Sequence, residues 1–151
     1  MLDDTDRRLL RQLQNDPAAT LQALATRAGV TAALAGRRFE RLRANGVLRG
    51  QHARIDWRAL GYAVEVSLRF TLEKSDPNAF ERFIAAAREV PEVIEIQTFL
   101  GRVDVRLSVI ARDLAHYHDL YRARIVTLPH IAEIEALMQV ATIKTNERLP
   151  L

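Results

Sequence analysis

The sequence predicts an α+β protein of two parts, a winged helix-turn-helix over residues 1–62 and a ferredoxin-like βαββαβ domain over residues 63–151. Three short capped helical patterns fill the first part. Period-2 strands and two helical stripes follow in the order β-α-β-β-α-β. The net charge of +3 is uneven, since residues 1–62 hold 11 Arg against 6 acidic residues and the remainder holds 11 basic against 13 acidic. This asymmetry favours a nucleic-acid-binding module joined to a second domain, and a chance distribution of surface charge is the alternative.

Each helical pattern of the first part begins at a capping residue and ends at a helix breaker. A side-chain oxygen just before a helix accepts one of its free amide hydrogens, so such residues predict helix starts. The capping residues are Asp3 or Asp4, Thr20 and Thr31. The ends are at Asn15-Asp16-Pro17, Gly29 and Asn45-Gly46. Two short helices joined through a glycine turn are typical of a helix-turn-helix.

The third helix combines an apolar face with a basic one. Its inner stripe is Ala35, Phe39 and Leu42, at positions i, i+4 and i+7. At about 100° per residue, Arg37 and Arg41 lie roughly 200° and 240° around the helix from Ala35. Four Arg against one acidic residue within seven positions favour DNA binding over an ordinary solvated face. We therefore expect this helix to enter the major groove.

A wing and further arginines complete the predicted DNA-binding surface. Residues 47–55 resemble a short two-stranded wing around Gly50, and His52 is expected on the surface. Gly36 costs roughly 1 kcal/mol relative to Ala inside a helix, and either a close approach of DNA or a tolerated defect explains it. The residues expected to contact DNA are Thr31, Ala33, Leu34, Arg37, Arg38, Arg41, Arg49 and Arg54.

The second part alternates strands and helices. Strands are predicted at 64–72, 92–100, 103–110 and 131–142. One helix opens at Asp76-Pro77 and another is ended by Pro129. The strand at 92–100 has apolar residues at both alternating sets of positions, and so has the last strand around Leu137. Two apolar faces favour burial against a second copy of the chain, and a homodimer would also duplicate the DNA-binding helix.

Composition argues against several other classes of protein. No Cys is present, which removes disulfides, Cys-ligated metals and thiol nucleophiles. The sequence contains neither an apolar run of the ~20 residues that span a membrane nor a basic signal-peptide start, so we expect a cytoplasmic protein. His116 and His118 lie about 200° apart on a helix and cannot chelate one metal. We expect no catalytic residue, metal or cofactor.

An ordered set of short motifs resembles the Lrp/AsnC (leucine-responsive regulator/asparagine regulator) family of bacterial and archaeal transcription factors. The resemblance covers nearly the whole chain. The motifs are Leu2-Asp3…Asp6…Leu9-Leu10, Arg38, Arg41 and Leu42, Gly46-Val47-Leu48…Gly50, Leu60-Gly61, Gly101-Arg102-Val103-Asp104, Leu128-Pro129, and Lys144…Leu149-Pro150-Leu151.

The resemblance implies dimers joined through the C-terminal sheets, often assembled into octamers around which double-stranded DNA bends. It also implies a small amino-acid-like effector near the Gly-x-x-Asp turn. The effector-binding residues it indicates are Leu100, Gly101, Arg102, Val103, Asp104 and Ala136. An ordinary turn is the alternative role of Arg102 and Asp104. The departures from the family pattern are Val105 for Tyr, His130 for Gly and Ala136 for Thr.

Two other functions compete with the DNA-binding regulator. Sirohaem decarboxylases resemble the same two-domain pattern and would use His and Arg in a C-terminal cleft. A metabolite-sensing domain without a DNA role is the other alternative, and it predicts a degraded first pair of helices. The capped, Arg-rich third helix disfavours both.

Overall fold

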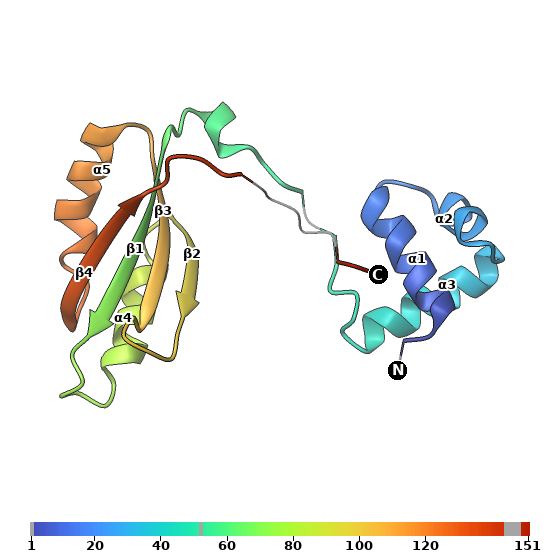
Figure 1. Cartoon of the computed structure of the whole chain (residues 1–151), viewed down its shortest axis with the longest axis horizontal. Helices are drawn as coiled ribbons and strands as arrows, with labels where there is room; N and C mark the ends of the chain where they lie inside the picture. Colours follow the sequence, from blue (N-terminus) through green and yellow to red (C-terminus); the bar gives the residue numbers. More distant parts are fainter. Residues whose placement is uncertain (1, 52, 144–148) are drawn as a thin grey trace. The chain divides into compact units, whose positions relative to one another are not determined.

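The structure is a computed structural model, and it describes residues 2–51, 53–143 and 149–151. The chain divides into two compact units, one of Met1–Arg54 with Lys144–Leu151 and one of Ile55–Ile143 (Figure 1). The segment 55–62, expected with the first part, therefore groups with the second, and the last residues group with the first. His52 and Lys144, named in the sequence predictions, lie outside the described residues.

Three helices make up the N-terminal unit: α1 (Asp4–Asn15), α2 (Leu21–Ala28) and α3 (Ala32–Ala44). The predicted caps are confirmed. Asp3 and Asp6 form a capping box at the start of α1. The hydroxyls of Thr20 and Thr31 each accept a backbone N–H three residues on, both at 3.2 Å. Gly29 ends α2 with φ +69°, a left-handed conformation that favours glycine.

The core of this unit is small and lies between the three helices. Its fully buried members include Leu9 of α1, Ala25 of α2 and Ala35 of α3. Phe39 and Leu42 continue the α3 stripe into the same cluster, as the sequence predicts. The inner face of α3 is therefore fixed against α1 and α2, and its opposite face is exposed.

The expected two-stranded wing after α3 is wrong for the described residues 47–51 and 53–56, where the chain forms no strand. The backbone N–H groups of Val47 and Leu48 both donate to the carbonyl of Leu42, at 2.9 and 3.1 Å. The Gln51 side chain donates to the Pro17 carbonyl at 2.7 Å. These contacts hold the chain against the helices, so its first amides are not available to a hairpin partner.

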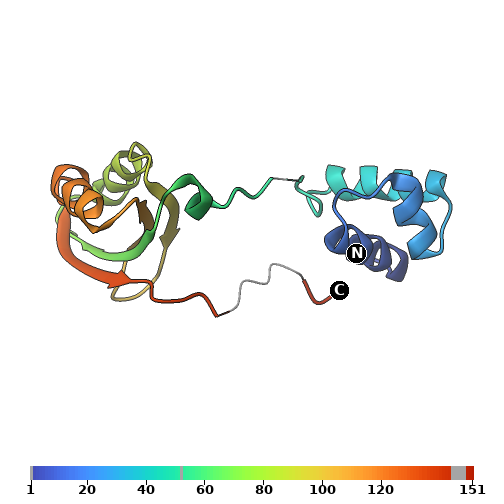
Figure 2. The same cartoon turned by 90° about the horizontal axis from the view of Figure 1, so that it is seen from above.

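The second unit begins with a short helical turn, η1 (Trp57–Leu60), and has the predicted β-α-β-β-α-β order. Its strands and helices are β1 (Val64–Leu72), α4 (Ala79–Arg88), β2 (Val93–Thr98), β3 (Val105–Ala111), α5 (Leu114–Leu120) with the π-helical turn η2 (Tyr121–Ile125), and β4 (Ile131–Met138). The sheet is antiparallel in the order β2-β3-β1-β4. Both helices cover one face (Figure 2). No helix in the described part of the chain is long and apolar enough to cross a membrane.

The core of the second unit lies between the sheet and its two helices. Val66, Leu68 and Phe70 of β1 point toward the helices and are fully buried. The Phe70 ring lies 4.9 Å from that of Phe83 on α4, centroid to centroid. Because strand side chains alternate, the intervening residues of β1 form the outer face of the sheet.

A register shift changes the alternation that the sequence predicts for β2. The register with β3 shifts between Val93 and Glu95, which removes Ile94 from the regular alternation. Val93 and Ile96 consequently lie on the helix-covered face, and Glu95 lies on the outer face. A β-bulge permits this because it places apolar positions three apart on one side.

Charged side chains cross the centre of the outer face. Arg69 of β1 lies opposite Arg106 of β3. Each arginine also has a carboxylate partner on its other neighbouring strand. Arg69 pairs with Glu135 of β4 at 3.4 Å, and Arg106 with Glu95 of β2 at 3.1 Å. Leu137 shares this face and is partly exposed.

Candidate nucleic-acid interface

The outward side of α3 presents the residues that the sequence predicts for DNA contact. Thr31, Ala33, Arg37 and Arg41 are exposed, and Leu34 is half-buried. Arg37 makes no hydrogen bond or ion pair with any residue that the structure describes. Its guanidinium is therefore available to an external anion or acceptor. Arg49 and Arg54 are exposed in the segment after α3.

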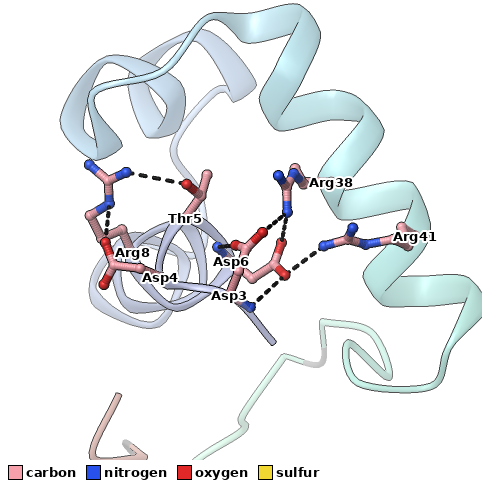
Figure 3. Close-up of polar contacts among 7 residues, drawn as sticks. All are labelled: Asp3, Asp4, Thr5, Asp6, Arg8, Arg38 and Arg41. Atoms are coloured by element: carbon pink, nitrogen blue, oxygen red, sulfur yellow. Dashed lines mark hydrogen bonds and ion pairs between the residues drawn. The ribbon is translucent and has the colours of Figure 1, made fainter. Parts of the chain in front are cut away.

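The side chains of Arg38 and of the exposed Arg41 extend from α3 toward the first turn of α1 (Figure 3). Nη1 of Arg38 lies 3.2 Å from Oδ1 of Asp6, and the same atom contacts the Asp3 carboxylate. Nη2 of Arg41 lies 2.6 Å from Oδ2 of Asp6. The Arg38 side chain is 23% exposed and that of Arg41 48%, whereas that of Asp6 is completely buried.

We call Asp3, Asp6, Arg38 and Arg41 the carboxylate clamp. Besides both arginines, Asp6 accepts the backbone N–H of Asp3 at 3.2 Å, and Asp3 accepts that of Asp6 at 2.9 Å. The pKa of the Asp3 carboxyl lies below its ordinary value, first because the Asp6 backbone N–H donates to it and second because Arg38 does. The hydrogen bond to the Asp3 carboxylate, and after it the contact with Asp6, raises the pKa of Arg38.

A role for Asp6 was not predicted from the sequence, although its position in the amphipathic pattern of α1 indicates one. Leu9, Leu10 and Leu13 follow it at i+3, i+4 and i+7, so Asp6 lies on the apolar stripe of α1. A carboxylate on a buried stripe requires cationic or hydrogen-bonding partners from elsewhere in the fold.

Gly36 lies on the side of α3 that faces the start of α2. A Cβ atom at this position would lie 3.5 Å from Cδ2 of Leu21, an ordinary van der Waals distance. The space beside the helix therefore does not require glycine, which leaves a tolerated defect as the simpler of the two explanations.

In the second unit, the predicted effector residues 100–104 form the connection between β2 and β3. The Asp104 carboxylate accepts the backbone N–H of Leu72 at 2.8 Å, and the Arg102 carbonyl accepts the Thr71 hydroxyl at 2.9 Å. The Asp104 carboxylate thus holds this turn against the end of β1 through a hydrogen bond. Leu100 is fully exposed.

Ala136 does not join these residues within one protomer. It pairs with Leu68, four positions along β1 from the Leu72 that Asp104 contacts, or roughly 13 Å at strand spacing. Ala136 shares the helix-covered face with Leu68, because directly paired residues point to the same side.

Two hollows lie beside the Asp104 turn. One, of only about 10 Å³, is lined by residues of the outer face that include Arg102 and Val103. The other, of about 260 Å³, lies at the end of β1 and was not predicted from the sequence. Its charged lining residues are Glu73, Lys74, Asp76 and Asp104. Within the described residues, no group of three or more His, Cys, Asp or Glu is placed to hold a metal ion.

Each of the two units matches a known protein family. Residues 2–43 match the AsnC-type helix-turn-helix domain, and residues 65–149 match the Lrp/AsnC ligand binding domain. The chain belongs to the Lrp/AsnC family. It is accordingly a DNA-binding transcriptional regulator of the Lrp/AsnC type, as the sequence motifs predict.

Relatives match the chain over nearly its whole length. The chain is 28% identical over 151 residues to the DNA-binding transcriptional activator DecR of Escherichia coli K12, covering 100% of this chain and 99% of DecR. Its structure matches that of an AsnC family transcriptional regulator from Agrobacterium tumefaciens with a TM-score of 0.88 and 28% identity, over 99% and 97% of the two chains.

A further Lrp/AsnC structure contains an amino acid. It is the feast or famine regulatory protein of M. tuberculosis complexed with L-methionine, 30% identical, with a TM-score of 0.84 and 99% of each chain covered. The likeness extends over the part of this chain that contains the Asp104 turn.

Proposed function

We propose that this regulator binds duplex DNA with α3 in the major groove and with Arg37 as its principal base or phosphate contact. The observation that carries the proposal is the exposed Arg37 guanidinium, which has no partner among the described residues. Ala33 lies one turn earlier on the same face, where a small side chain permits close approach.

Neighbouring residues extend this contact. Leu34 and Arg41 border Arg37 on α3, and the backbone at Thr31 faces phosphate because helix N-termini attract anions. Arg49 and Arg54 contact the flanking backbone. Arg38 is the exception among the residues predicted from the sequence, because Asp3 and Asp6 both bind its guanidinium and its side chain is 23% exposed. Among the residues that the structure describes, Arg41 is bound by Asp6 alone, and its side chain is 48% exposed.

The regulator acts in the cytoplasm as a homodimer or a higher assembly such as an octamer, and it has no enzymatic activity. A closed assembly duplicates α3, as a pseudo-palindromic operator requires. Support comes from large apolar side chains that one protomer leaves exposed on β4 and just after it. These are Leu137, Met138, Val140 and Ile143.

An amino-acid-like effector binds at the Asp104 turn. The 260 Å³ hollow there presents Lys74 to a carboxylate and Glu73 and Asp76 to an ammonium group, which suits a zwitterion. Ala136 reaches this turn only if a second protomer supplies it, since the two lie apart within one chain.

Selection of bound fragments from genomic DNA tests the proposal directly. We expect enrichment of a pseudo-palindromic sequence, and the logarithm of its binding constant should fall linearly with the logarithm of salt concentration. Recovery of fragments without any shared sequence would contradict sequence-specific binding. Light scattering on the same sample should give a mass of at least two protomers.

A further inference from the structure

We propose that Asp6 is a positioning residue for DNA recognition, which acts through Arg38 and Arg41 to set the rotation of α3. The proposal deepens the DNA-binding function proposed for α3 and rests on it. In this arrangement Arg38 holds the helix and makes no contact with DNA, whereas Arg37 makes the contact.

The chemistry of the clamp is that of a strong, directional attachment. Asp6 is completely buried, and its two oxygens accept from Arg38, Arg41 and the Asp3 backbone N–H (Figure 3). Hydrogen bonds between charged groups are shorter and stronger than neutral ones. A buried carboxylate without such partners is costly, so both arginines are held on the α1 side of α3.

Arg38 and Arg41 attach α3 to Asp6 at two points about one helical turn apart. These two contacts fix the rotation of α3 about its axis, which the apolar core does not fix. α3 contributes Ala35, Phe39 and Leu42 to the core, and hydrophobic contacts have no directional preference. Rotating α3 by about 20° moves the tip of an outward arginine by roughly 3 Å, given its distance from the helix axis. A shift of that size breaks a hydrogen bond to a base edge.

Neither the capping box nor stability alone requires a charged side chain at this position, because a neutral amide also completes such a box. Asp6 occupies the apolar stripe of α1, where a well-packed hydrophobic side chain is often at least as stabilising as a buried ion pair. Asp3 and Asp6 also neutralise the positive charge of Arg38, which would otherwise attract any phosphate. The clamp therefore favours a defined orientation over general attraction to DNA.

The test compares operator with random duplex of equal length, at several salt concentrations, for the full chain and for Asp6→Asn, Asp3→Asn and Arg38→Gln. Asp6→Asn should lower the operator-to-random affinity ratio by roughly tenfold, as a lost base contact does. Asp3→Asn should lower the ratio less, since Asn still caps α1 and leaves Asp6 in place. Arg38→Gln should lower the ratio with an unchanged salt slope.

Asp4→Asn is the matched control, because Asp4 lies on the same helix turn but pairs only with Arg8, at 3.3 Å, in the described structure. It should leave the ratio unchanged. Circular dichroism gives the folded fraction of each variant. A purely structural role lowers both affinities by one factor, so an unchanged ratio in Asp6→Asn or, where that variant does not fold, in Asp3→Asn overturns the proposal.

Direct contact of Arg38 with DNA would also overturn the proposal, and it would show as a salt slope reduced by about one in Arg38→Gln. Wild-type protein that binds the operator no better than random DNA is a different result. It would contradict the DNA-binding function itself and the role of the clamp with it.

Discussion

Oδ2 of Asp6 lies 2.6 Å from Nη2 of Arg41, so a completely buried carboxylate of α1 is joined to an arginine of α3 that is about half exposed. Asp6 thus belongs to the core of the N-terminal unit, and Arg41 lies at the border of the proposed DNA surface. Because Arg38 shares the same carboxylate, the charge of Asp6 links the stability of the N-terminal unit to the orientation of its DNA-binding face.

The first prediction concerns the loss of stability in acid when Asp3 is protonated. The pKa of Asp3 is lowered from 3.8, so its ionised form contributes stability that is present above that pH and is lost as the pH falls through the lowered value. The melting temperature of wild type should exceed that of Asp3→Asn at about pH 6, and the difference should shrink below pH 3.8. Thermal unfolding followed by circular dichroism measures both melting temperatures. A difference between them that does not depend on pH would contradict the prediction.

The second prediction concerns Arg37. Arg37→Ala should weaken operator binding by about 1–3 kcal/mol if the side chain reads a base, or reduce the salt slope by about one if it contacts phosphate. Arg88→Ala is a suitable control, since Arg88 is an exposed arginine in the last turn of α4. Fluorescence anisotropy provides both quantities. Equal binding by wild type and Arg37→Ala would contradict the role of Arg37 as the principal DNA contact.

The third prediction concerns Gly36. Gly36→Ala should stabilise the N-terminal unit by about 1 kcal/mol, because alanine is the better helix former and its Cβ meets Leu21 at an ordinary distance. Operator affinity should not change, since this side of α3 faces α2. A stable variant that loses affinity would instead indicate a close approach of the DNA backbone.

The fourth prediction concerns the structural role of Asp104 in the turn between β2 and β3. Asp104→Ala should destabilise the unit of Ile55–Ile143 by about 1–3 kcal/mol, because the backbone N–H of Leu72 loses its acceptor. Urea unfolding followed by tryptophan fluorescence of Trp57 reports on this unit. An unchanged midpoint would show that the carboxylate does not support the turn.

The fifth prediction concerns the effector. Calorimetry with a panel of amino acids should find a ligand at millimolar concentration or lower, and Lys74→Ala should weaken its binding because the carboxylate loses its counter-ion. Arg88→Ala, which removes an exposed cation that does not line the hollow, is the control for a general change in charge. A panel without any binder would contradict effector binding at this hollow.

Local sequence was sufficient to predict most of the elements. Thr20, Thr31 and Gly29 mark helix ends through contacts with residues at most four positions away. The alternation in β1 likewise predicts its buried face, because the pleat has a period of two. The exposure of Arg37 follows from the same helical geometry.

Features that depend on distant residues were not predictable in this way. The partner of Arg41 is 35 positions earlier in the chain, and Gln51 contacts Pro17 across 34 positions. The bulge that turns Val93 and Ile96 to one face is a property of the pairing between β2 and β3.

The sequence by itself determined the family, the order of helices and strands, and the basic character of α3, because periodicity, caps and motifs are all contained in short stretches. Only the tertiary structure decided which of the α3 arginines face outward and which are bound by Asp6. The physical reason is that an arginine has the same charge in either position, and its role depends on whether a carboxylate from another helix lies within hydrogen-bonding distance.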